Sequence, residues 1–474
     1  MEDVIVIGAG VIGAFVARNL ARYRLRCLVI EKSLDVGDGS SMANSAIVHS
    51  GYDPIPGTKK AICNVAGNAM YDEIASDLEV PFRRIGSLTI AEDEEGIKTL
   101  QSLLDRAKQN NVPARIVYQD ELRSIEPAIS KEALAALLCP TAGIVDPFLL
   151  VARAFENALD NGVKLRLGEE VTSIKRTDGV YEVTTSKGRY LSKCVVNCAG
   201  LHSDEIANMV GSKGYRIIPK KGEYHVLDHF GPFVRHTLFP LPSKKGKGIL
   251  ITPTTSSNYL VGPSSDPIEE KEDVSTDSPT LSQVAEKAKS LVKELPLSER
   301  VRVFSGVRAS IEGGDFIIEE DEGNPGFINL VGIDSPGLAS APYIGKIAVE
   351  ELLSRRIKLV ENPSYNPKVR HYVRPSLLSL SERNALIEAN PDYGRIVCTC
   401  EKVSLAELED ILSRSLPCLT IKAMKKRSRA GFGKCQGGFC QAKVLMLLSK
   451  KLGIKPEEVL YDGPNSSILM EESK

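Results

Sequence analysis

A glycine turn between two short apolar strands constrains the fold of this chain most strongly. Residues 3–7, Asp-Val-Ile-Val-Ile, form an apolar run typical of a buried parallel strand. Three glycines follow at once in the spacing G-x-G-x-x-G: Gly8, Gly10 and Gly13. A helical apolar pattern comes next, and a second apolar strand at 27–30 ends in Glu31. Strand, glycine turn, helix, strand and acid in this order predict a βαβ unit that binds a dinucleotide.

The same segment also predicts how the ligand is held. The glycines permit a tight turn, close approach to a pyrophosphate and close helix–strand packing, and the pyrophosphate would lie at the positive end of the helix. Glu31 would accept hydrogen bonds from a ribose diol, and its charge disfavours a 2′-phosphate. The alternative is a glycine turn in an α/β sheet that holds no ligand. The strand, helix and acid around the motif favour the dinucleotide.

Composition excludes several classes of protein. A length of 474 residues suggests about three structural units. The hydrophobic content of 42% and charged content of 26% are those of a globular protein, which excludes disorder and fibres. Sixty basic and 61 acidic residues leave a net charge of -1, which argues against a protein that coats nucleic acid. No apolar run is long enough to span a membrane. Because the first strand begins at Asp3, we expect no secretory signal and a cytoplasmic location.

The ten cysteines divide by position. Without a secretory signal, a disulfide framework is not expected in a chain of this size. Six are scattered, and we expect small buried side chains in a reducing compartment: Cys27, Cys63, Cys139, Cys194, Cys198 and Cys418. Four cluster near the C-terminus as C-x-C, thirty-four intervening residues and C-x4-C: Cys398, Cys400, Cys435 and Cys440.

The clustered cysteines have the pattern of a ligand set. Structural zinc prefers C-x2–4-C pairs on both sides, so the C-x-C pair fits zinc poorly. Four thiolates also bind a [2Fe–2S] cluster. Zinc, a redox disulfide and an empty site stay open as alternatives.

A basic run overlaps this region. Residues 422–434 contain six cations and no acid: Lys422, Lys425, Lys426, Arg427, Arg429 and Lys434. Such a run is usually a solvated face. The alternatives are that it offsets an anionic cluster or docks an acidic electron partner. Nucleic-acid binding is disfavoured because the run lacks interleaved aromatic residues.

Several later segments carry a resemblance to a known family. Residues 44–51, 56–61 with Cys63, 195–200, and 327–332 with 337–342 are similar to segments that the D-amino-acid-oxidase superfamily of FAD enzymes places around its flavin. The resemblance covers roughly residues 1–356. Within the superfamily the chain is most similar to L-2-hydroxyglutarate oxidases and to anaerobic glycerol-3-phosphate dehydrogenases. It implies an α/β fold with a discontinuous Rossmann-like FAD-binding domain and an interleaved α+β substrate domain.

The resemblance also implies which residues bind FAD. The implied set combines the glycine turn, the acid after the second strand, the flavin-side segment and the returning strands: Gly8, Gly10, Gly13, Glu31, Lys32, Ser41, Asn44, Val171, Ala199, Gly200, Gly332, Gly337 and Leu338. A residue near Val171 would contact the adenine through its backbone.

The domain boundaries follow from the same resemblance. The FAD-binding domain would comprise 1–80, 145–215 and 306–356, and the substrate domain 81–144 and 216–305. An acidic stretch from Asp266 to Asp277 is expected to be a solvated loop. A linker would follow at 357–390, then an iron–sulfur domain at 391–450 and a tail at 451–474.

The C-terminal spacing has its own resemblance. It is similar to the small helical [2Fe–2S] domain of bacterioferritin-associated ferredoxin, also found at the C-terminus of anaerobic glycerol-3-phosphate dehydrogenases. Residues 431–440 fit the last ligand loop of that domain, whose glycines would let backbone N–H groups approach the sulfurs. We therefore expect a redox partner protein or a second flavoprotein subunit, and an oligomer. Peripheral membrane association would require such a partner.

Four residues are candidates for the substrate side. Oxidation of an alcohol by a flavin requires a group to take the hydroxyl proton and a cation to hold an anionic substrate. His49, in the flavin-side segment, is the first candidate base, and His225 is the rival. Tyr224 matches an aromatic position that faces the flavin. Arg308 matches the position of an arginine that binds the substrate carboxylate or phosphate.

The two halves of the resemblance disagree on the substrate. The C-terminal cysteines favour sn-glycerol 3-phosphate, which would give dihydroxyacetone phosphate. The loop Gly332–Gly337 lacks the lysine of respiratory glycerol-3-phosphate dehydrogenases and favours L-2-hydroxyglutarate. An amine or imino acid such as proline or an opine is a third option. An electron-transfer subunit without a substrate of its own is the alternative from another class.

Overall fold

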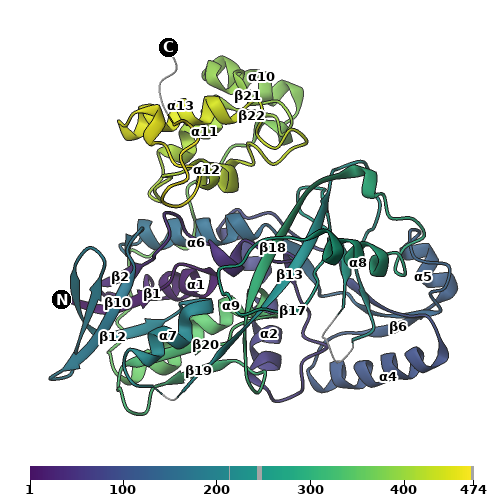
Figure 1. Ribbon diagram of the computed structural model, residues 1–474, viewed down its shortest axis with the longest axis horizontal. Coiled ribbons are helices and arrows are strands. Elements are labelled where there is room, and N and C mark those ends of the chain that lie inside the picture. Colours follow the sequence, from purple (N-terminus) through teal and green to yellow (C-terminus); the bar gives the residue numbers. More distant parts are fainter. Residues whose placement is uncertain (213, 243–247, 471–474) are drawn as a thin grey trace.

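The sheet that carries the glycine turn has eight strands (Figure 1). The computed structural model describes residues 1–212, 214–242 and 248–470. The parallel part has the order β20-β12-β1-β2-β9, and β11-β10 and β19 join it antiparallel. The strands are β1 (Glu2–Ile7), β2 (Cys27–Ile30), β9 (Lys164–Arg166), β10 (Val171–Thr177), β11 (Val180–Thr185), β12 (Arg189–Asn197), β19 (Ile317–Glu320) and β20 (Phe327–Val331).

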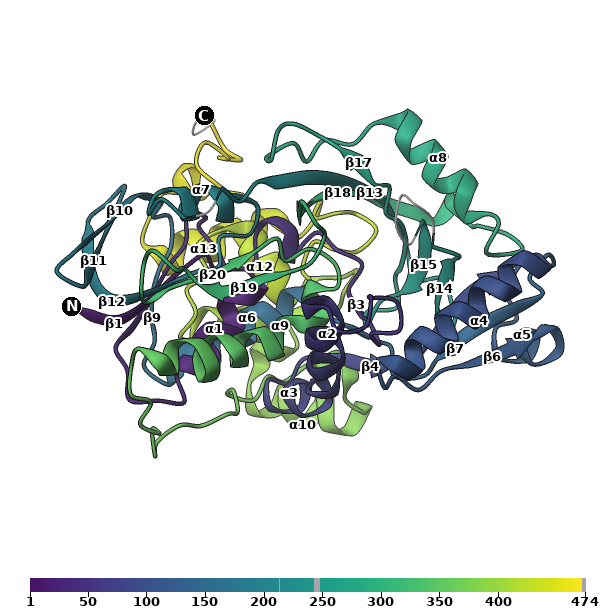
Figure 2. The same ribbon diagram turned by 90° about the horizontal axis from the view of Figure 1, so that it is seen from below.

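Both faces of this sheet are covered, which explains why β1 is apolar throughout. Val4 and Val6 pack into one cluster with helices α1, α6 and α9, whereas Ile5 and Ile7 pack against the β10–β11 hairpin and α7 (Figure 2). The hairpin turns at Asp178-Gly179, where both residues have positive φ. The helices of this unit are α1 (Val11–Leu20), α2 (Lys59–Ala69), α3 (Tyr71–Asp77), α6 (Pro147–Asp160), α7 (Ser203–Asn208) and α9 (Gly337–Lys346).

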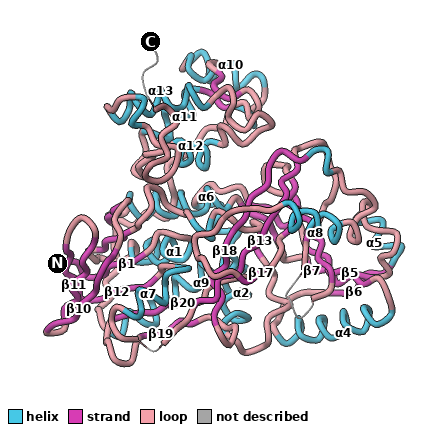
Figure 3. Tube along the Cα trace, in the orientation of Figure 1, coloured by secondary structure: helices cyan, strands magenta, loops and turns pink. Residues whose placement is uncertain are grey.

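A second sheet of nine strands forms the neighbouring unit. Helices α4 (Glu94–Gln109), α5 (Gln119–Ile125) and α8 (Ser278–Ala288) accompany it on the right of Figure 3. Its strands are β5 (Ser87–Ala91), β6 (Arg115–Tyr118), β7 (Ala135–Cys139), β13 (Ile217–Leu227), β14 (Thr237–Pro240), β15 (Leu250–Pro253), β16 (Tyr259–Gly262), β17 (Asp266–Pro267) and β18 (Arg300–Ile311). A small sheet of β3 (Ile47–Val48), β8 (Gly143–Val145) and β4 (Phe82–Arg84) lies apart from it in the hydrogen-bond pattern.

Two long strands run through the second sheet and reach back to the first unit. β13 and β18 pair antiparallel from Ile217–Ile311 to Leu227–Arg300. β18 therefore continues across the expected domain boundary between 305 and 306. We propose that the chain forms the two interleaved domains expected from the sequence. The whole of β18 then belongs to the substrate domain, because it pairs with β13 along its length.

The C-terminal unit is small and mainly helical, and it stands above α6 in Figure 1. It contains α10 (Leu380–Ala389), α11 (Leu405–Leu412), α12 (Ile421–Ser428), α13 (Gln441–Leu452) and the strand pair β21 (Ile396–Cys398) and β22 (Val403–Ser404). Its core includes Tyr372 from the expected linker and Val459 from the expected tail. The stretch 451–470 is thus part of this unit rather than a tail, because its apolar side chains complete the core. Residues 471–474 lie outside the described part.

The sequence also predicts the burial of the scattered cysteines and the lack of a membrane-spanning helix. All six scattered cysteines are free and buried, as predicted. No helix in the described part of the chain is long and apolar enough to cross a membrane.

Candidate functional site: a trough across two sheets and its C-terminal wall

The glycine turn leaves no room for side chains. Gly8 has a φ of +101°, and a Cβ there would lie 2.5 Å from the carbonyl oxygen of Cys198. A Cβ on Gly13 would lie 2.0 Å from the carbonyl oxygen of Gly8. The turn therefore packs directly on the end of β12. The first turn of α1 is held by Ser41, whose Oγ accepts a hydrogen bond from the Val11 N–H at 2.9 Å.

Glu31 ends β2 beside this turn, as the motif predicts. Its carboxylate accepts hydrogen bonds from the Ala9 N–H at 2.6 Å and the Ser33 N–H at 2.8 Å. Burial raises the pKa of Glu31, and the two N–H groups oppose that effect. The carboxylate is thus fixed at the wall of a cavity with acceptor capacity left for a ribose.

Two adjoining cavities, of about 900 and 960 Å³, form a trough along the carboxyl ends of the parallel strands. The first, which we call the substrate-side cavity, lies between the two sheets; the second, the nucleotide-side cavity, reaches Glu31 and the C-terminal unit. They share part of their walls: Gly10, Ser40, Ser41, Ala43, Asn44, Cys198, Gly200, Gly306 and Val307. Ligands bind at this edge in open α/β sheets.

Most of the predicted FAD residues line this trough: Gly8, Gly10, Glu31, Lys32, Ser41, Asn44, Ala199, Gly200, Gly337 and Leu338. Gly13 and Gly332 do not line it but shape the turns beside it, and Gly332 has a φ of +69°. Val171 is buried in β10, and its neighbours Gly168 and Glu170 line the nucleotide-side cavity instead.

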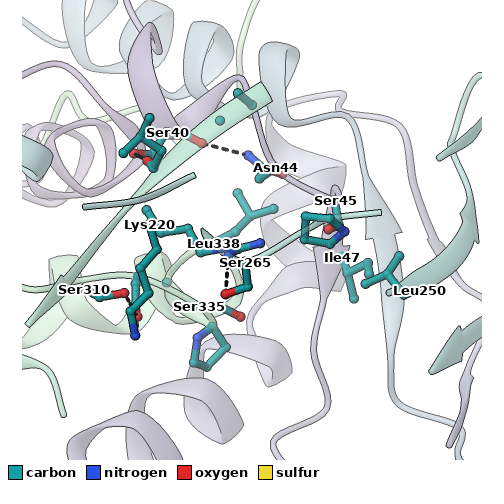
Figure 4. Close-up of a pocket in the computed structure, with 18 of the residues that line it drawn as sticks. Ser40, Asn44, Ser45, Ile47, Lys220, Leu250, Ser265, Ser310, Ser335 and Leu338 are labelled. Atoms are coloured by element: carbon teal, nitrogen blue, oxygen red, sulfur yellow. Dashed lines mark hydrogen bonds between the residues drawn. The ribbon is translucent and has the colours of Figure 1, made fainter. Parts of the chain in front are cut away.

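The flavin-side segment is held in an irregular conformation by its own side chains. Asn44 Nδ2 donates to the Ser41 carbonyl, and Asn44 Oδ1 accepts from the Ala46 N–H at 2.8 Å. Ala46 has a φ of +59°, which the asparagine stabilises. Ser45 Oγ and Tyr224 OH are 3.0 Å apart across the substrate-side cavity. Figure 4 shows Asn44 and Ser45 on this wall.

The structure separates the two candidate histidines. His49 lines the substrate-side cavity, with its ring centroid 5.8 Å from that of Phe239. His225 is outside the described lining of both cavities. It is buried against α8, where its Nε2 is 2.9 Å from the Leu281 carbonyl oxygen, and burial lowers its pKa. Neighbouring residues of a strand point to opposite faces, so Tyr224 faces the cavity and His225 does not.

A pair of cations lines the substrate-side cavity opposite this segment. Arg308 of β18 and Lys220 of β13 are directly paired across the two strands. Arg308 donates to the Ser264 carbonyl at 3.2 Å and lies 3.4 Å from Ser265 Oγ. Neither cation forms an ion pair among the residues that the structure describes. Figure 4 places Lys220 beside Ser310 and Ser335.

Lys220 was not among the predicted site residues. The signal was present, because Lys220 and Tyr224 are four residues apart on one strand and so share a face. The glycine between them, Gly222, also has a structural reason. A Cβ there would lie 2.7 Å from Arg308 Nη2, so the glycine makes room for the guanidinium.

The loop after β20 carries an acid, Asp334. Asp334 lines the substrate-side cavity, accepts from Lys60 Nζ at 2.6 Å and accepts from Ser310 Oγ at 2.8 Å. Lys60, on α2, thus supplies a cation to this loop from another part of the chain. The charge of Asp334 is therefore compensated by Lys60 within the protein itself.

The acidic stretch from Asp266 to Asp277 is largely exposed, as expected of a solvated loop, and ion pairs also anchor it to the first unit. Lys271 Nζ pairs with Asp204 at 2.7 Å and Glu205 at 2.6 Å, and Glu272 pairs with Lys32 at 2.7 Å. Lys271 and Glu272 both line the nucleotide-side cavity. The stretch therefore crosses the mouth of this cavity.

The four clustered cysteines meet as two pairs. The sulfurs of Cys400 and Cys435 are 3.7 Å apart. Burial, the charges of the nearby Cys398 and Cys435 and a hydrogen bond to Cys398 raise the pKa of the Cys440 thiol to about 12. No group of three or more His, Cys, Asp or Glu side chains in the described chain has the arrangement of a metal site.

The loop around Cys435 brings backbone donors to its sulfur. Burial alone would raise the pKa of Cys435, but the N–H groups of Gly437, Phe439 and Gly438 lower it below the ordinary value. Gly433 packs directly on the other side of the pair, where a Cβ would lie 2.3 Å from Cys400 Cβ. The expectation that glycines let N–H groups approach the sulfurs is met at Cys435.

Most of the basic run at 422–434 is not a solvated face, which corrects that interpretation. Lys425, Lys426 and Arg427 of α12 are buried. Lys426 Nζ is 2.8 Å from Asp35 Oδ2 and from Asp38 Oδ1, and Arg427 also pairs with Asp35. The acidic partner of the run is the loop after β2 of the same chain.

Replacing Asp35 with alanine should destabilise the docked C-terminal unit by about 3 kcal/mol, because Arg427 and Lys426 would remain buried without their partner. Burial alone would raise the pKa of Asp35, but the two cations hold it below its ordinary value. Its stabilising effect is therefore present at neutral pH and lost only as pH falls through that lowered pKa. Urea unfolding would measure the loss. Asp120→Ala, on the exposed side of α5, is the matched control, and equal losses in both variants would contradict the account.

The C-terminal unit also touches the trough. Phe432 packs on Phe148 at the start of α6 with ring centroids 5.4 Å apart. Gln436 Oε1 lies 3.4 Å from Arg302 Nη1 on β18, the strand that carries Arg308. Phe432 and Gln436 line the nucleotide-side cavity. The cysteine loop therefore forms one wall of the trough.

The chain is similar in sequence to known flavin enzymes. The family model described as FAD dependent oxidoreductase matches residues 3–351. A glycerol 3-phosphate dehydrogenase of Caloramator mitchellensis is 42% identical over 100% of this chain and 99% of its own length. An L-2-hydroxyglutarate dehydrogenase of Indibacter alkaliphilus is 27% identical over 74% of this chain and 99% of its own.

A solved structure matches most of the chain. It is the L-alpha-glycerophosphate oxidase of Mycoplasma pneumoniae with FAD bound, with a TM-score of 0.75 and 28% identity. The match covers 99% of the oxidase but only 78% of this chain. The oxidase thus leaves about a fifth of this chain without a counterpart, whereas the Caloramator dehydrogenase spans all of it.

Proposed function

The chain belongs to the family of FAD dependent oxidoreductases and is of the glycerol-3-phosphate dehydrogenase type, and from this premise we propose its reaction. It oxidises sn-glycerol 3-phosphate to dihydroxyacetone phosphate. The electrons leave through a [2Fe–2S] cluster held by Cys398, Cys400, Cys435 and Cys440. It acts as a dehydrogenase with a protein acceptor rather than as an oxidase that reduces O2.

The cation pair Lys220–Arg308 carries the substrate proposal. The two side chains are adjacent across β13 and β18 and form no ion pair in the described chain. Two adjacent cations suit one dianionic group, such as a phosphate. A dicarboxylate such as L-2-hydroxyglutarate needs two cations placed apart. Arg308 would hold the phosphate through its planar guanidinium, and Lys220 would add a second charge.

The residues along the trough fit FAD. Gly8, Gly10 and the N-terminus of α1 would hold the pyrophosphate, and Glu31 the ribose diol. Bound FAD supplies a hydride acceptor, the flavin N5. His49 lines the same cavity as the cation pair, so we assign it to take the substrate hydroxyl proton. Tyr224, hydrogen-bonded to Ser45, would orient the substrate between His49 and the cation pair.

The cysteine spacing favours iron over zinc. Structural zinc prefers C-x2–4-C pairs on both sides, and Cys398 and Cys400 form a C-x-C pair. Two thiol pairs suit a cluster of two irons, each bound by two thiolates. A bound cluster supplies one-electron transfer. The N–H groups of Gly437, Gly438 and Phe439 would stabilise its charged sulfur ligand.

Replacing Gly433 with alanine tests the cluster without removing a ligand. The new Cβ would displace Cys400, so we expect iron and acid-labile sulfide per chain to fall severalfold while FAD is retained. Gly463→Ala is the matched control in the same unit, since a Cβ there meets nothing within 4 Å. Zinc instead of iron in the wild-type protein would contradict the cluster assignment.

Product analysis tests the substrate. We expect stoichiometric dihydroxyacetone phosphate from sn-glycerol 3-phosphate with an artificial one-electron dye as acceptor. Inorganic phosphate should inhibit competitively, because it would occupy Lys220 and Arg308, and glutarate should not. Inhibition by glutarate alone would favour the hydroxyglutarate alternative.

A further inference from the structure

One end of the set of four clustered cysteines lies at the protein surface. Cys400 is exposed and Cys435 is partly exposed, whereas Cys398 and Cys440 are buried. Phe439 donates its N–H to Cys435 and is itself 82% exposed. A large aromatic side chain thus stands in solvent beside the accessible thiol pair.

The exposed residue pattern of α13 extends this surface. Lys443, Met446 and Lys450 follow Phe439 at intervals of four, three and four residues, which places the helical members on one face. Met446 is 57% exposed, and the opposite face of the helix is buried in the core through Val444, Leu445 and Leu448. We call Phe439, Lys443, Met446 and Lys450 the α13 face.

The charge of this region is strongly one-sided. Between Asp410 and Glu457 the chain has eleven cations and no acid. Five of them are used inside the protein, where they pair with acids of other segments: Arg414, Lys422, Lys426, Arg427 and Arg429. Lys425 is buried. The others are exposed and form no ion pair within the described ranges: Lys434, Lys443, Lys450, Lys451 and Lys455.

We propose that the α13 face docks a redox protein whose contact surface is acidic around an apolar centre. This inference rests on the proposed function, because it assigns the exit point of the electrons. Phe439 and Met446 would form the apolar centre and the unpaired lysines the polar rim, which is the usual anatomy of an interface. Complementary charge speeds encounter and selects the partner. The five cations that pair with acids of this chain cannot attract such a partner, because their charges are already compensated.

The test uses the full-length holoenzyme and a named probe. Reduced ferredoxin, a small acidic one-electron carrier, would pass its electrons to the oxidised enzyme, which is the favourable direction because ferredoxin has the lower potential, and a reduced neutral dye would serve as the second electron donor. The variants are Phe439→Ser and Lys443→Glu with Lys450→Glu. Lys98→Glu, exposed on α4 of the substrate unit, makes the same change of charge far from the cysteines.

We expect the α13-face variants to lower the second-order rate with ferredoxin at least ~10-fold at low salt, and the wild-type rate to fall as salt increases. Rates with the neutral dye and the Lys98→Glu rates should be unchanged. Unchanged ferredoxin rates in the α13-face variants, or an equal loss in Lys98→Glu, would overturn the proposal. So would binding to phosphatidylglycerol vesicles that the same variants abolish, because the face would then be a membrane-binding surface.

Two separate readouts distinguish this inference from the proposed function. Flavin bleaching by substrate reports the reaction, and iron content reports the cluster. If both are normal and the α13-face variants behave as wild type, only the docking proposal fails. If the flavin does not bleach, the proposed function fails first.

Discussion

Replacement of Arg308 with lysine should raise the KM for sn-glycerol 3-phosphate ~30-fold, with a smaller effect on kcat. The guanidinium donates to the Ser264 carbonyl, lies next to Gly222 and lines the substrate-side cavity. Lysine keeps the charge but loses the bidentate geometry, which corresponds to about 2 kcal/mol. Alanine also removes the charge, and we expect a ~300-fold increase in KM.

Lys220 provides a second test of the anion-binding assignment. Because it is the cross-strand neighbour of Arg308, the effects of Lys220→Met and Arg308→Lys should not add. Arg300→Lys, at the exposed start of the same strand, is the matched control. Steady-state kinetics measures Lys220→Met, Arg308→Lys, the variant that combines both changes, and Arg300→Lys. An unchanged KM in Arg308→Lys would remove the anion-binding assignment.

Replacement of Gly13 with alanine should yield protein without flavin. The new Cβ would lie 2.0 Å from the backbone carbonyl oxygen of Gly8, and neither backbone segment can yield without opening the turn. We expect FAD affinity to fall more than ~100-fold, equivalent to about 2.8 kcal/mol. The visible absorption of the purified protein and FAD titration of the apoprotein measure this.

The matched control for Gly13→Ala is Gly214→Ala, since a Cβ at Gly214 meets nothing within 4 Å. This variant should be yellow and bind FAD normally. Normal flavin content in Gly13→Ala would show that the turn does not hold the dinucleotide.

The first unit could be predicted from the sequence because its signals are local. The glycine turn, the acid at position 31 and the Asp178-Gly179 hairpin each require a particular backbone conformation within a few residues. Local chemistry dictates these elements. The segments at the end of β20 and the start of α9 are expected from the resemblance to the FAD enzymes.

The cation pair and the docked C-terminal unit could not be predicted, because they depend on contacts between distant segments. Arg308 meets Lys220 only through the register of β13 and β18, which are about eighty residues apart in the chain. The basic run meets Asp35 across almost 400 residues. A run of lysines looks the same in the sequence whether it is solvated or buried against acids.

Anaerobic titration of the holoenzyme tests the central claim most directly. We predict that sn-glycerol 3-phosphate bleaches the flavin absorption band and that L-2-hydroxyglutarate does not, because two adjacent cations bind one dianionic group. Bleaching by L-2-hydroxyglutarate alone, or by neither compound, would contradict this account.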